Sequence, residues 1–300
     1  MTYKIAIASG KGGTGKTTVA VNLYHAIARE ITNLVGITDC DVEEPNTAIF
    51  FPGKTIVENQ IIYQQVPEIN ISKCTFCRKC LEYCEFNAIV VIPQTRFADI
   101  NKDLCHSCGG CSVACQHDAI KEVPVEVGEI HYFDVGFGNG ITRGLLKIGS
   151  TMQTRVIKEV KSKIFAKNEI MLYDAPPGTS CPVVETIADT DFVILVTEPT
   201  PFGLYDLKLM VELARDLGKD FGVIVNKSDI GTPEVYDYLE EERIELLGKI
   251  PFSKDYASSY ARGQLFENTP SKIKSAYQSI LDKVIKKIAK HDERNYSIER

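Results

Sequence analysis

Short, unbroken apolar runs recur along most of the chain. They lie at residues 4–9, 34–38, 170–173, 192–197 and 221–226. The runs are rich in Val, Ile and Leu and show no alternation of apolar and polar positions. This pattern predicts strands that are buried on both faces of a sheet.

Segments with helical spacing of apolar positions separate these runs. We expect helices at about 15–30, 157–166, 203–217 and 233–242. Buried strands that alternate with helices are typical of a parallel sheet covered on both faces. The sequence therefore predicts a doubly wound, mostly parallel α/β fold.

The pattern changes between residues 64 and 127, where short segments are punctuated by cysteine. Eight of the ten cysteines fall in this stretch, and the α/β alternation resumes after it. We therefore expect an inserted domain at 64–127 in an α/β domain formed by 1–63 and 128–300. In a reducing compartment, clustered cysteines at short regular spacing indicate bound metal rather than disulfides.

The inserted segment contains an internal repeat with a period of 31 residues. One copy runs from Cys74 to Ile89 and the other from Cys105 to Ile120. Each copy has the spacing Cys-x₂-Cys-x₂-Cys-x₃-Cys and ends in Ala-Ile. A duplicated half-unit is the simplest explanation.

This spacing is similar to the bacterial ferredoxin run, in which the fourth cysteine ligates the other cluster of a two-cluster protein. The resemblance implies an α+β ferredoxin-like domain that holds two [4Fe–4S] clusters per chain. The ligands of the first cluster would be Cys74, Cys77, Cys80 and Cys115, and those of the second Cys105, Cys108, Cys111 and Cys84. Zinc is the competing metal, but four-cysteine zinc sites more usually use well-separated Cys-x₂-Cys pairs.

Two details of the repeat depart from a plain ferredoxin run. Glu85 and Gln116 follow the fourth cysteines, where proline is normal, and this change should leave ligation intact. Arg78 and Lys79 lie inside the first run, and their counterparts are the glycines at 109–110. A positive pair could raise the reduction potential of a nearby cluster, although solvated surface charge explains the pair equally well.

A glycine-rich loop follows the first predicted strand and opens the first predicted helix. Its glycines let backbone N–H groups point at an anion, and the helix N-terminus adds partial positive charge. We expect Lys16 to reach the β- and γ-phosphates of ATP and Thr17 to bind Mg²⁺. The residues expected to hold ATP or ADP are Gly12, Gly13, Thr14, Gly15, Lys16, Thr17 and Thr18. The alternative is a turn that only connects a strand to a helix.

A further lysine, Lys11, gives the loop the form Lys-Gly-Gly-Xaa-Gly-Lys-Thr. With this loop the sequence resembles the MinD/ParA/Mrp superfamily of P-loop ATPases, which is related to the nitrogenase iron protein. The resemblance implies an ATPase that forms a homodimer, with Lys11 reaching the nucleotide of the partner subunit as a catalytic residue. A solvated surface lysine is the plainer alternative.

The second strand ends at a segment that resembles the switch I region of this superfamily, Asp39-Cys40-Asp41. The resemblance implies that Asp41 orients or activates the attacking water and that Asp39 lies nearer to Mg²⁺. The residues alone leave these two roles interchangeable. Either aspartate could also be a helix cap.

Two later segments match the same superfamily. The stretch 172–178 resembles a Walker B and switch II region, which implies that Asp174 supports Mg²⁺ and that the N–H of Gly178 moves toward the γ-phosphate. Asn226 ends an apolar strand, as the base-contacting asparagine of the superfamily does. An Asx turn is the alternative for Asn226.

The remaining cysteines, Cys40 and Cys181, lie outside the repeat. Cys40 is expected to be a small buried residue. Cys181 follows Asp174 at the distance at which the nitrogenase iron protein has a cluster-ligating cysteine. A packed residue, a metal ligand shared between subunits, and a redox or substrate contact remain open for Cys181. The Cys-x-x-Cys of an Mrp-type bridging site is missing.

Apolar residues recur at helical spacing near the C-terminus: Ile273, Tyr277, Ile280, Val284 and Ile288. MinD-like proteins carry a membrane-binding helix at this end. Here we expect the stripe to pack on the sheet without stable membrane insertion, because residues 292–300 are polar.

Composition and charge narrow the function further. The net charge of −6 gives no support to a nucleic-acid-binding surface. The first apolar strand begins at residue 4 and leaves no room for a signal peptide. We therefore expect a cytoplasmic protein with no nucleic-acid partner.

These features predict an ATPase that couples ATP-driven switching of a dimer to electron transfer through the two clusters. Its partner would be an unidentified redox or client protein. One alternative is an iron–sulfur cluster assembly or carrier ATPase of the Mrp type, although fully ligated sites argue against labile cargo. The other is a positioning ATPase that uses the clusters as a redox gate, and no basic surface supports it.

Overall fold

The structure is a computed structural model that describes residues 2–32, 34–136, 139–162, 168–265 and 269–298. The chain divides into two compact units. The first consists of Met1–Asn59, Ile130–Leu145 and Ile157–Arg300, and the second of Gln60–Glu129 and Leu146–Val156. The expected insert at 64–127 lies inside the second unit, which also takes residues 146–156 from the expected ATPase domain.

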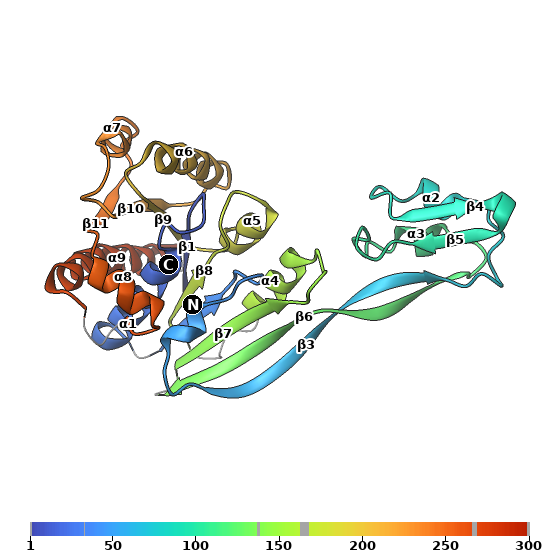
Figure 1. Ribbon diagram of the computed structural model, residues 1–300, viewed down its shortest axis with the longest axis horizontal. Helices are drawn as coiled ribbons and strands as arrows, with labels where there is room; N and C mark the ends of the chain where they lie inside the picture. The colour runs from blue at the N-terminus through green and yellow to red at the C-terminus, as the bar shows by residue number, and fades with distance from the viewer. Residues whose placement is uncertain (1, 33, 137–138, 163–167, 266–268, 299–300) are drawn as a thin grey trace. The chain divides into compact units, whose positions relative to one another are not determined.

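The first unit is built on a mostly parallel sheet (Figure 1). Within the described residues the sheet has nine strands in the order β11-β10-β9-β1-β8-β2-β7-β6-β3. The strands are β1 (Tyr3–Ala8), β2 (Val35–Asp39), β3 (Thr55–Ile69), β6 (Ile120–Gly136), β7 (Asn139–Leu146), β8 (Ile170–Asp174), β9 (Phe192–Thr197), β10 (Phe221–Asn226) and β11 (Leu246–Ile250). Strands β3 and β6 contribute residues to both units. The pairs of β1 with β8 and β9, of β2 with β7 and β8, and of β10 with β9 and β11 are all parallel.

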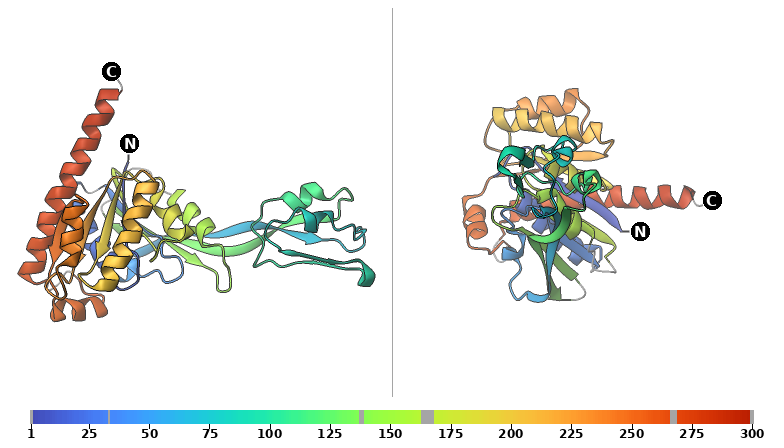
Figure 2. Two further views of the ribbon diagram at one scale, coloured as in Figure 1. Left: turned by 90° about the horizontal axis from the view of Figure 1, so that it is seen from above. Right: turned by 90° about the vertical axis from the view of Figure 1, so that its right-hand side faces the viewer.

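Helices cover both faces of this sheet, as expected for a doubly wound fold. Figures 1 and 2 show α1 and α9 on one face and α5 and α6 on the other. The helices are α1 (Lys16–Glu30), α4 (Gln153–Ser162), α5 (Cys181–Ile187), α6 (Pro201–Asp216), α7 (Glu234–Glu241), α8 (Lys254–Ala261) and α9 (Ser271–Ile298), with a short 3₁₀ turn η1 (Thr47–Phe50). The predicted α/β fold is thus confirmed.

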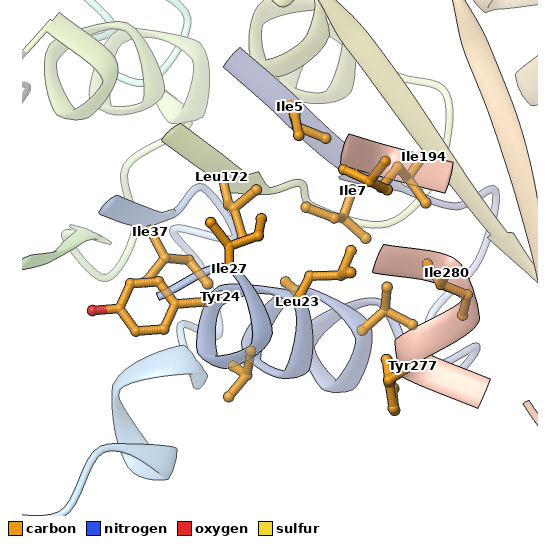
Figure 3. Packing of buried hydrophobic residues seen from close by; sticks show 14 of the residues in the cluster. Ile5, Ile7, Leu23, Tyr24, Ile27, Ile37, Leu172, Ile194, Tyr277 and Ile280 are labelled. Carbon is orange, nitrogen blue, oxygen red and sulfur yellow. The ribbon is translucent and has the colours of Figure 1, made fainter. Parts of the chain in front are cut away.

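Apolar side chains from both layers form the core of the first unit. Leu23 and Ile27 of α1 face Ile7 of β1 and Leu172 of β8, and all four are fully buried (Figure 3). A fully buried aliphatic side chain contributes about 1.5–3 kcal/mol. The continuous apolar runs were therefore reliable signals for these strands.

The C-terminal stripe packs on this core, as predicted. Ile273, Tyr277, Ile280 and Val284 belong to the buried cluster, and Ile288 packs partly against it. Figure 3 shows Tyr277 and Ile280 of α9 directed toward α1 and the sheet. None of the helices in the described part of the chain combines the length and apolar character needed to cross a membrane.

The second unit contains a small antiparallel ribbon of β4 (Ile89–Ile92) and β5 (Phe97–Ile100). A 3₁₀ turn, η2 (Pro93–Thr95), joins the two strands. Two short helices, α2 (Lys79–Glu82) and α3 (Gly110–Ala114), come from the matching parts of the sequence repeat. Phe76, Val91 and Ile100 share a buried cluster with the cysteines Cys105 and Cys111. Cys105 and Cys111 are thus part of the core of this unit, whereas Cys77 and Cys108 are exposed.

Candidate functional site

The parallel register brings the predicted nucleotide-binding residues to one edge of the sheet. Ile7 of β1 pairs with Asp174 of β8, and Asp174 pairs with Asp39 of β2. The loop after β1 therefore lies beside the ends of β8 and β2. Ligand sites of open α/β sheets form at this carboxyl edge.

A cavity of about 420 Å³ opens at this edge within the first unit. Eight predicted residues line it: Gly12, Gly13, Gly15, Lys16, Thr17, Thr18, Asp41 and Asn226. The other predicted residues of the site, namely Lys11, Thr14, Asp39, Asp174 and Gly178, do not contribute to its lining. Predicted residues that lie far apart in the sequence, from Gly12 to Asn226, thus line one cavity.

Glycine is required at position 15 of the loop. Gly15 has φ of 98°, a left-handed conformation that L side chains rarely adopt. A Cβ there would lie 2.4 Å from Nδ2 of Asn226. Asn226 donates a hydrogen bond from this nitrogen to the Thr14 carbonyl at 2.8 Å and accepts one from the Lys227 N–H at 2.9 Å. Asn226 therefore holds the loop as well as forming the local turn.

The loop wraps the Lys16 ammonium group. Lys16 Nζ donates to Ser9 Oγ at 3.0 Å and lies 3.4 Å from the Lys11 carbonyl oxygen. Burial lowers the pKa of Lys16, and the carboxylates of Asp174 and Asp41 oppose this shift. A phosphate oxygen would give this partly desolvated cation a stronger acceptor than a hydroxyl.

Asp39 and Asp174 form a buried acidic pair. Burial and mutual repulsion raise the pKa of Asp39 to about 8, and burial raises the pKa of Asp174 to about 6. Thr47 connects the two: its N–H donates to Asp39 Oδ2 at 2.9 Å and its hydroxyl to Asp174 Oδ2 at 3.2 Å.

One oxygen of this pair, Asp174 Oδ1, is buried without a hydrogen-bond partner. Such an atom is costly unless a cation or donor satisfies it. The Thr17 hydroxyl, the expected Mg²⁺ ligand, lowers the pKa of Asp174 and so opposes the effect of burial. The oxygen donors of Thr17, Asp174 and Asp39 are of the type that Mg²⁺ prefers, so the residues fit this ion.

Gly178 and Asp41, the two predicted switch residues, have different surroundings in the structure. The N–H of Gly178 donates to the Ser9 carbonyl at 3.0 Å, and Gly178 has φ of 98°. Its N–H is therefore engaged with the loop after β1 in this structure. Asp41 faces the cavity, and burial raises its pKa. A raised pKa suits a group that accepts a proton from water.

An ion-paired cluster that the sequence did not reveal surrounds Lys11. Glu198, which follows β9, accepts from Lys11 Nζ at 2.5 Å and from Lys227 Nζ at 2.9 Å. Its own side chain is only 12% exposed. These two lysines lower the pKa of Glu198 against the opposing effect of burial. The signal that could have revealed Glu198 is its place at the carboxyl end of a buried parallel strand.

The other end of the cavity is lined by residues that the motifs did not include. The segment after β11 contributes Pro251, Phe252 and Ser253, and the helices α8 and α9 contribute Tyr256, Tyr260 and Tyr277. Tyr277 therefore belongs both to the apolar stripe and to the cavity wall. Aromatic side chains are common in sites that bind flat rings.

The second unit contains two small recesses, and each one is lined by one of the predicted four-cysteine sets. The first, of about 20 Å³, is lined by Cys74, Cys77, Cys80 and Cys115. The second, also of about 20 Å³, is lined by Cys84, Cys105, Cys108 and Cys111. The fourth cysteine of each run thus faces the recess of the other run, as the crossed ligand assignment expected.

The backbone around the two recesses repeats with the sequence. The N–H groups of Phe76 and Ala119 donate to the sulfurs of Cys74 and Cys115, both at 3.4 Å. In the second recess, the N–H groups of Ser107 and Ala88 donate to Cys105 at 3.5 Å and to Cys84 at 3.4 Å. The left-handed residues also correspond: Phe76 and Ser107, Arg78 and Gly109, Asn87 and Asp118.

The thiols respond differently to their surroundings. Burial raises the pKa of Cys80 to about 11 and also raises that of Cys111. The backbone N–H of Lys79 lowers the pKa of Cys77. Among the described residues, no three His, Cys, Asp or Glu side chains are grouped as a metal ion would require. In each recess, four cysteines line a small space, and backbone N–H groups donate to two of the four sulfurs.

The two remaining cysteines differ in exposure. Cys40 is fully buried, as expected, and burial raises its pKa. Cys181 is exposed at the first position of α5. A packed role for Cys181 is therefore not observed in the isolated chain.

Comparison with known proteins identifies the family of the chain. A family model described as "CobQ/CobB/MinD/ParA nucleotide binding domain" matches residues 5–266. The chain belongs to this family. The predicted ATPase is confirmed at this level, together with the family part of the resemblance. The inserted ferredoxin-like domain and the relation to the nitrogenase iron protein stay predictions.

Individual relatives cover nearly the whole chain. "Uncharacterized protein MJ0578" of Methanocaldococcus jannaschii is 31% identical over 94% of this chain and 96% of its own length. "Iron-sulfur cluster carrier protein" of Pyrococcus horikoshii is 25% identical over 95% of this chain and 86% of its own. The septum site-determining protein MinD of Pyrococcus horikoshii, solved with Mg-ADP, superposes with a TM-score of 0.56 at 20% identity, over 95% of this chain and 96% of that one. This last likeness supports the fold alone.

Proposed function

We propose that the chain is an ATP-hydrolysing iron–sulfur protein, in which the nucleotide state controls the use of two [4Fe–4S] clusters. The observation that carries the proposal is the pairing of each predicted four-cysteine set with its own recess. The ATPase part follows from the family, and the cluster part from the chemistry of the cysteine unit.

The cavity at the sheet edge would hold ATP or ADP with Mg²⁺. Lys16 would exchange Ser9 for the β- and γ-phosphates, and Thr17, with Asp174 and Asp39 behind it, would hold Mg²⁺. The ion supplies charge stabilisation at the phosphates when bound. Asp41 would orient the attacking water. Asn226 and the aromatic side chains that line the cavity would contact the base of the nucleotide. The match to a family described as a nucleotide binding domain supports this choice of ligand.

The two recesses fit [4Fe–4S] clusters. Four thiolates per cluster is the ligand number that such clusters require, and hydrogen bonds to sulfur are a usual feature of their sites. Each recess offers four cysteines, two measured N–H donors to sulfur and an apolar wall, which includes Val91 in the first and Ile100 in the second. When bound, the clusters would supply one-electron chemistry or would themselves be delivered.

Two uses of the clusters remain, and each has its own support. The relative named as an iron–sulfur cluster carrier favours a carrier or assembly function of the Mrp type. The comparisons thus favour the alternative over the electron-transfer function that the sequence analysis put first. The four cysteines in each recess favour clusters that stay bound to the chain, and therefore electron transfer. In both cases the chain would act as a homodimer, with Lys11 reaching the partner's nucleotide.

A cluster-transfer assay separates these uses. The full chain, purified without oxygen and loaded with ⁵⁵Fe, is mixed with an apo-ferredoxin in the presence of ATP, ADP or no nucleotide. A carrier delivers labelled iron to the acceptor at a rate that depends on ATP. An electron carrier keeps its iron, and the reduction potentials of its clusters change with the nucleotide.

The matched control is Lys16→Ala, which should bind iron normally while its clusters no longer respond to ATP. Iron that neither moves nor changes potential with nucleotide would contradict the proposed coupling. A chain that binds no iron would contradict the cluster assignment itself.

A further inference from the structure

The two cysteine recesses have matching backbone hydrogen bonds but differ in the charged residues around them. Their N–H donors to sulfur occupy matching positions and have nearly equal lengths, 3.4 Å and 3.4 Å against 3.5 Å and 3.4 Å. Each recess also has one histidine in its lining, His117 in the first and His106 in the second. These four N–H···S hydrogen bonds are therefore matched between the two recesses, whereas the charged residues around them differ.

Cations gather around the first recess. Arg78 and Lys79 belong to its lining. Lys79 Nζ donates at 2.7 Å to the side chain of Gln116, which directly follows the ligand Cys115. This bond anchors the ammonium group beside the fourth cysteine of the set. Arg96 adds a further cation. Its Cζ atom lies 5.5 Å from the ring centre of Phe76, which lines the first recess.

The matching positions of the second recess carry no cation. Gly109 stands in place of Arg78, and Gly110 in place of Lys79. The carboxylate of Glu122 lies in the space that an Arg side chain would enter, because a Cβ on Gly109 would be 3.4 Å from Glu122 Oε1. Ser112 donates to the same oxygen at 3.3 Å. Glu85, the counterpart of Gln116, follows the fourth cysteine of this set.

We propose that this asymmetry orders the two clusters: the first recess holds the cluster of higher reduction potential, and a single electron on the chain resides there. The inference rests on the proposed cluster assignment. Reduction adds one negative charge to a cluster, so neighbouring cations stabilise the reduced form and carboxylates destabilise it. The step is a one-electron transfer in which no bond forms or breaks. An electron on the chain would accordingly settle at the first recess.

The size of the effect is limited by solvent. Arg78 and Lys79 are exposed, so their charges are screened by water and salt. Removing both is expected to change the ratio of reduced first site to reduced second site by about tenfold, which corresponds to about 59 mV for a one-electron couple. The shift should shrink as the salt concentration rises.

A redox titration followed by electron paramagnetic resonance tests the order. The full chain is purified without oxygen and titrated with dithionite and mediator dyes, and each transition is assigned with variants that lack one site, Cys80→Ser and Cys111→Ser. The double variant Arg78→Gln with Lys79→Gln should lower only the higher potential. Lys121→Gln, which removes a lysine that lines neither recess, is the control and should move neither.

A second variant adds a cation instead of removing one, so that a shift in potential cannot be attributed to a folding defect of the first variant. Gly110→Lys adds the missing cation to the second recess, and its Cβ would make only ordinary contacts, 3.6 Å from Cys108 Sγ and 3.8 Å from the Tyr83 carbonyl. It should raise the lower potential.

Two clusters whose potentials ignore both variants, or a first site that is harder to reduce than the second, would overturn the inference while leaving the proposed function standing. A chain without iron would overturn both.

Discussion

The proposed nucleotide site and the cysteine recesses hold their side chains in opposite ways. In the nucleotide site the ligating groups already bind one another: Lys16 donates to Ser9, and Thr47 bridges Asp39 and Asp174. A ligand must exchange these contacts. In the recesses, backbone N–H groups hold the sulfurs around an existing space.

This difference indicates which region changes state. Charged groups that trade partners give a site two arrangements of similar free energy, which is what a switch requires. In the recesses, the left-handed residues Phe76 and Ser107 donate their N–H groups to sulfur, and these contacts involve no charged side chain. We therefore expect the nucleotide site to switch and the cysteine unit to keep its geometry. The following changes test that contrast.

The largest effect should come from the loop lysine. Lys16→Ala removes the cation that stabilises charge on the transferred phosphate, and the rate of ATP hydrolysis should fall about 100- to 1000-fold. The iron content should stay unchanged. Phosphate release and iron analysis on one preparation check both, with Lys272→Ala on the exposed start of α9 as the control. Iron lost together with activity would mean that the two regions are not separate.

Paired cysteine changes should distinguish crossed from uncrossed ligation. Cys77→Ser with Cys115→Ser affects one recess, so about half of the iron should remain. Cys77→Ser with Cys84→Ser affects both recesses, so nearly all iron should be lost. Both proteins should still hydrolyse ATP. The reverse order of iron contents would show that the four cysteines of each run serve one cluster.

Breaking the ion pair at Glu198 should make pairing of subunits easier. Glu198→Gln weakens the hold on Lys11, which the proposed dimer needs at the partner's nucleotide. A partly exposed ion pair contributes about 0.2–1 kcal/mol, and two such pairs would open in each homodimer, so dimerisation should strengthen up to about thirtyfold. Sedimentation with a slowly hydrolysed ATP analogue measures it, with the exposed Glu240→Gln as the control. Weaker dimerisation would mean that Glu198 itself contacts the partner.

The smallest effect concerns protons. A carboxyl with a pKa of about 8 is mostly protonated at pH 7, so Mg²⁺–ADP should displace about one proton from the pair that contains Asp39. Above about pH 9 that carboxyl is already ionised and the release should disappear. Calorimetry in two buffers of different ionisation enthalpy measures the release. Asp39→Asn should abolish it, and an unchanged release would place the proton elsewhere.

The sequence predicted the elements that depend on local pattern. The buried strands, the loop around Lys16 and the two cysteine sets followed from continuous apolar runs and fixed spacings. It did not predict β3, in which apolar residues such as Ile56 and Val57 are exposed and therefore give no burial pattern. It predicted neither β11 nor α8, which are short, and its helix at 157–166 begins earlier, at Gln153, and runs into residues outside the described ones.

The missed site residues have partners far along the chain. Thr47 meets Asp174 across 127 positions, and Glu198 meets Lys11 across 187. No motif contains both members of either pair, because only the parallel register of the sheet brings them together. The aromatic side chains that line the cavity were missed for the same reason, since Tyr256 and Tyr277 come from helices that the loop motif does not include.

The most direct test of the account is the iron and acid-labile sulfide content of the full chain, purified without oxygen. Two four-thiolate recesses predict about eight iron and about eight sulfide per chain. A chain that hydrolyses ATP but carries only zinc, or neither iron nor sulfide, would contradict the account.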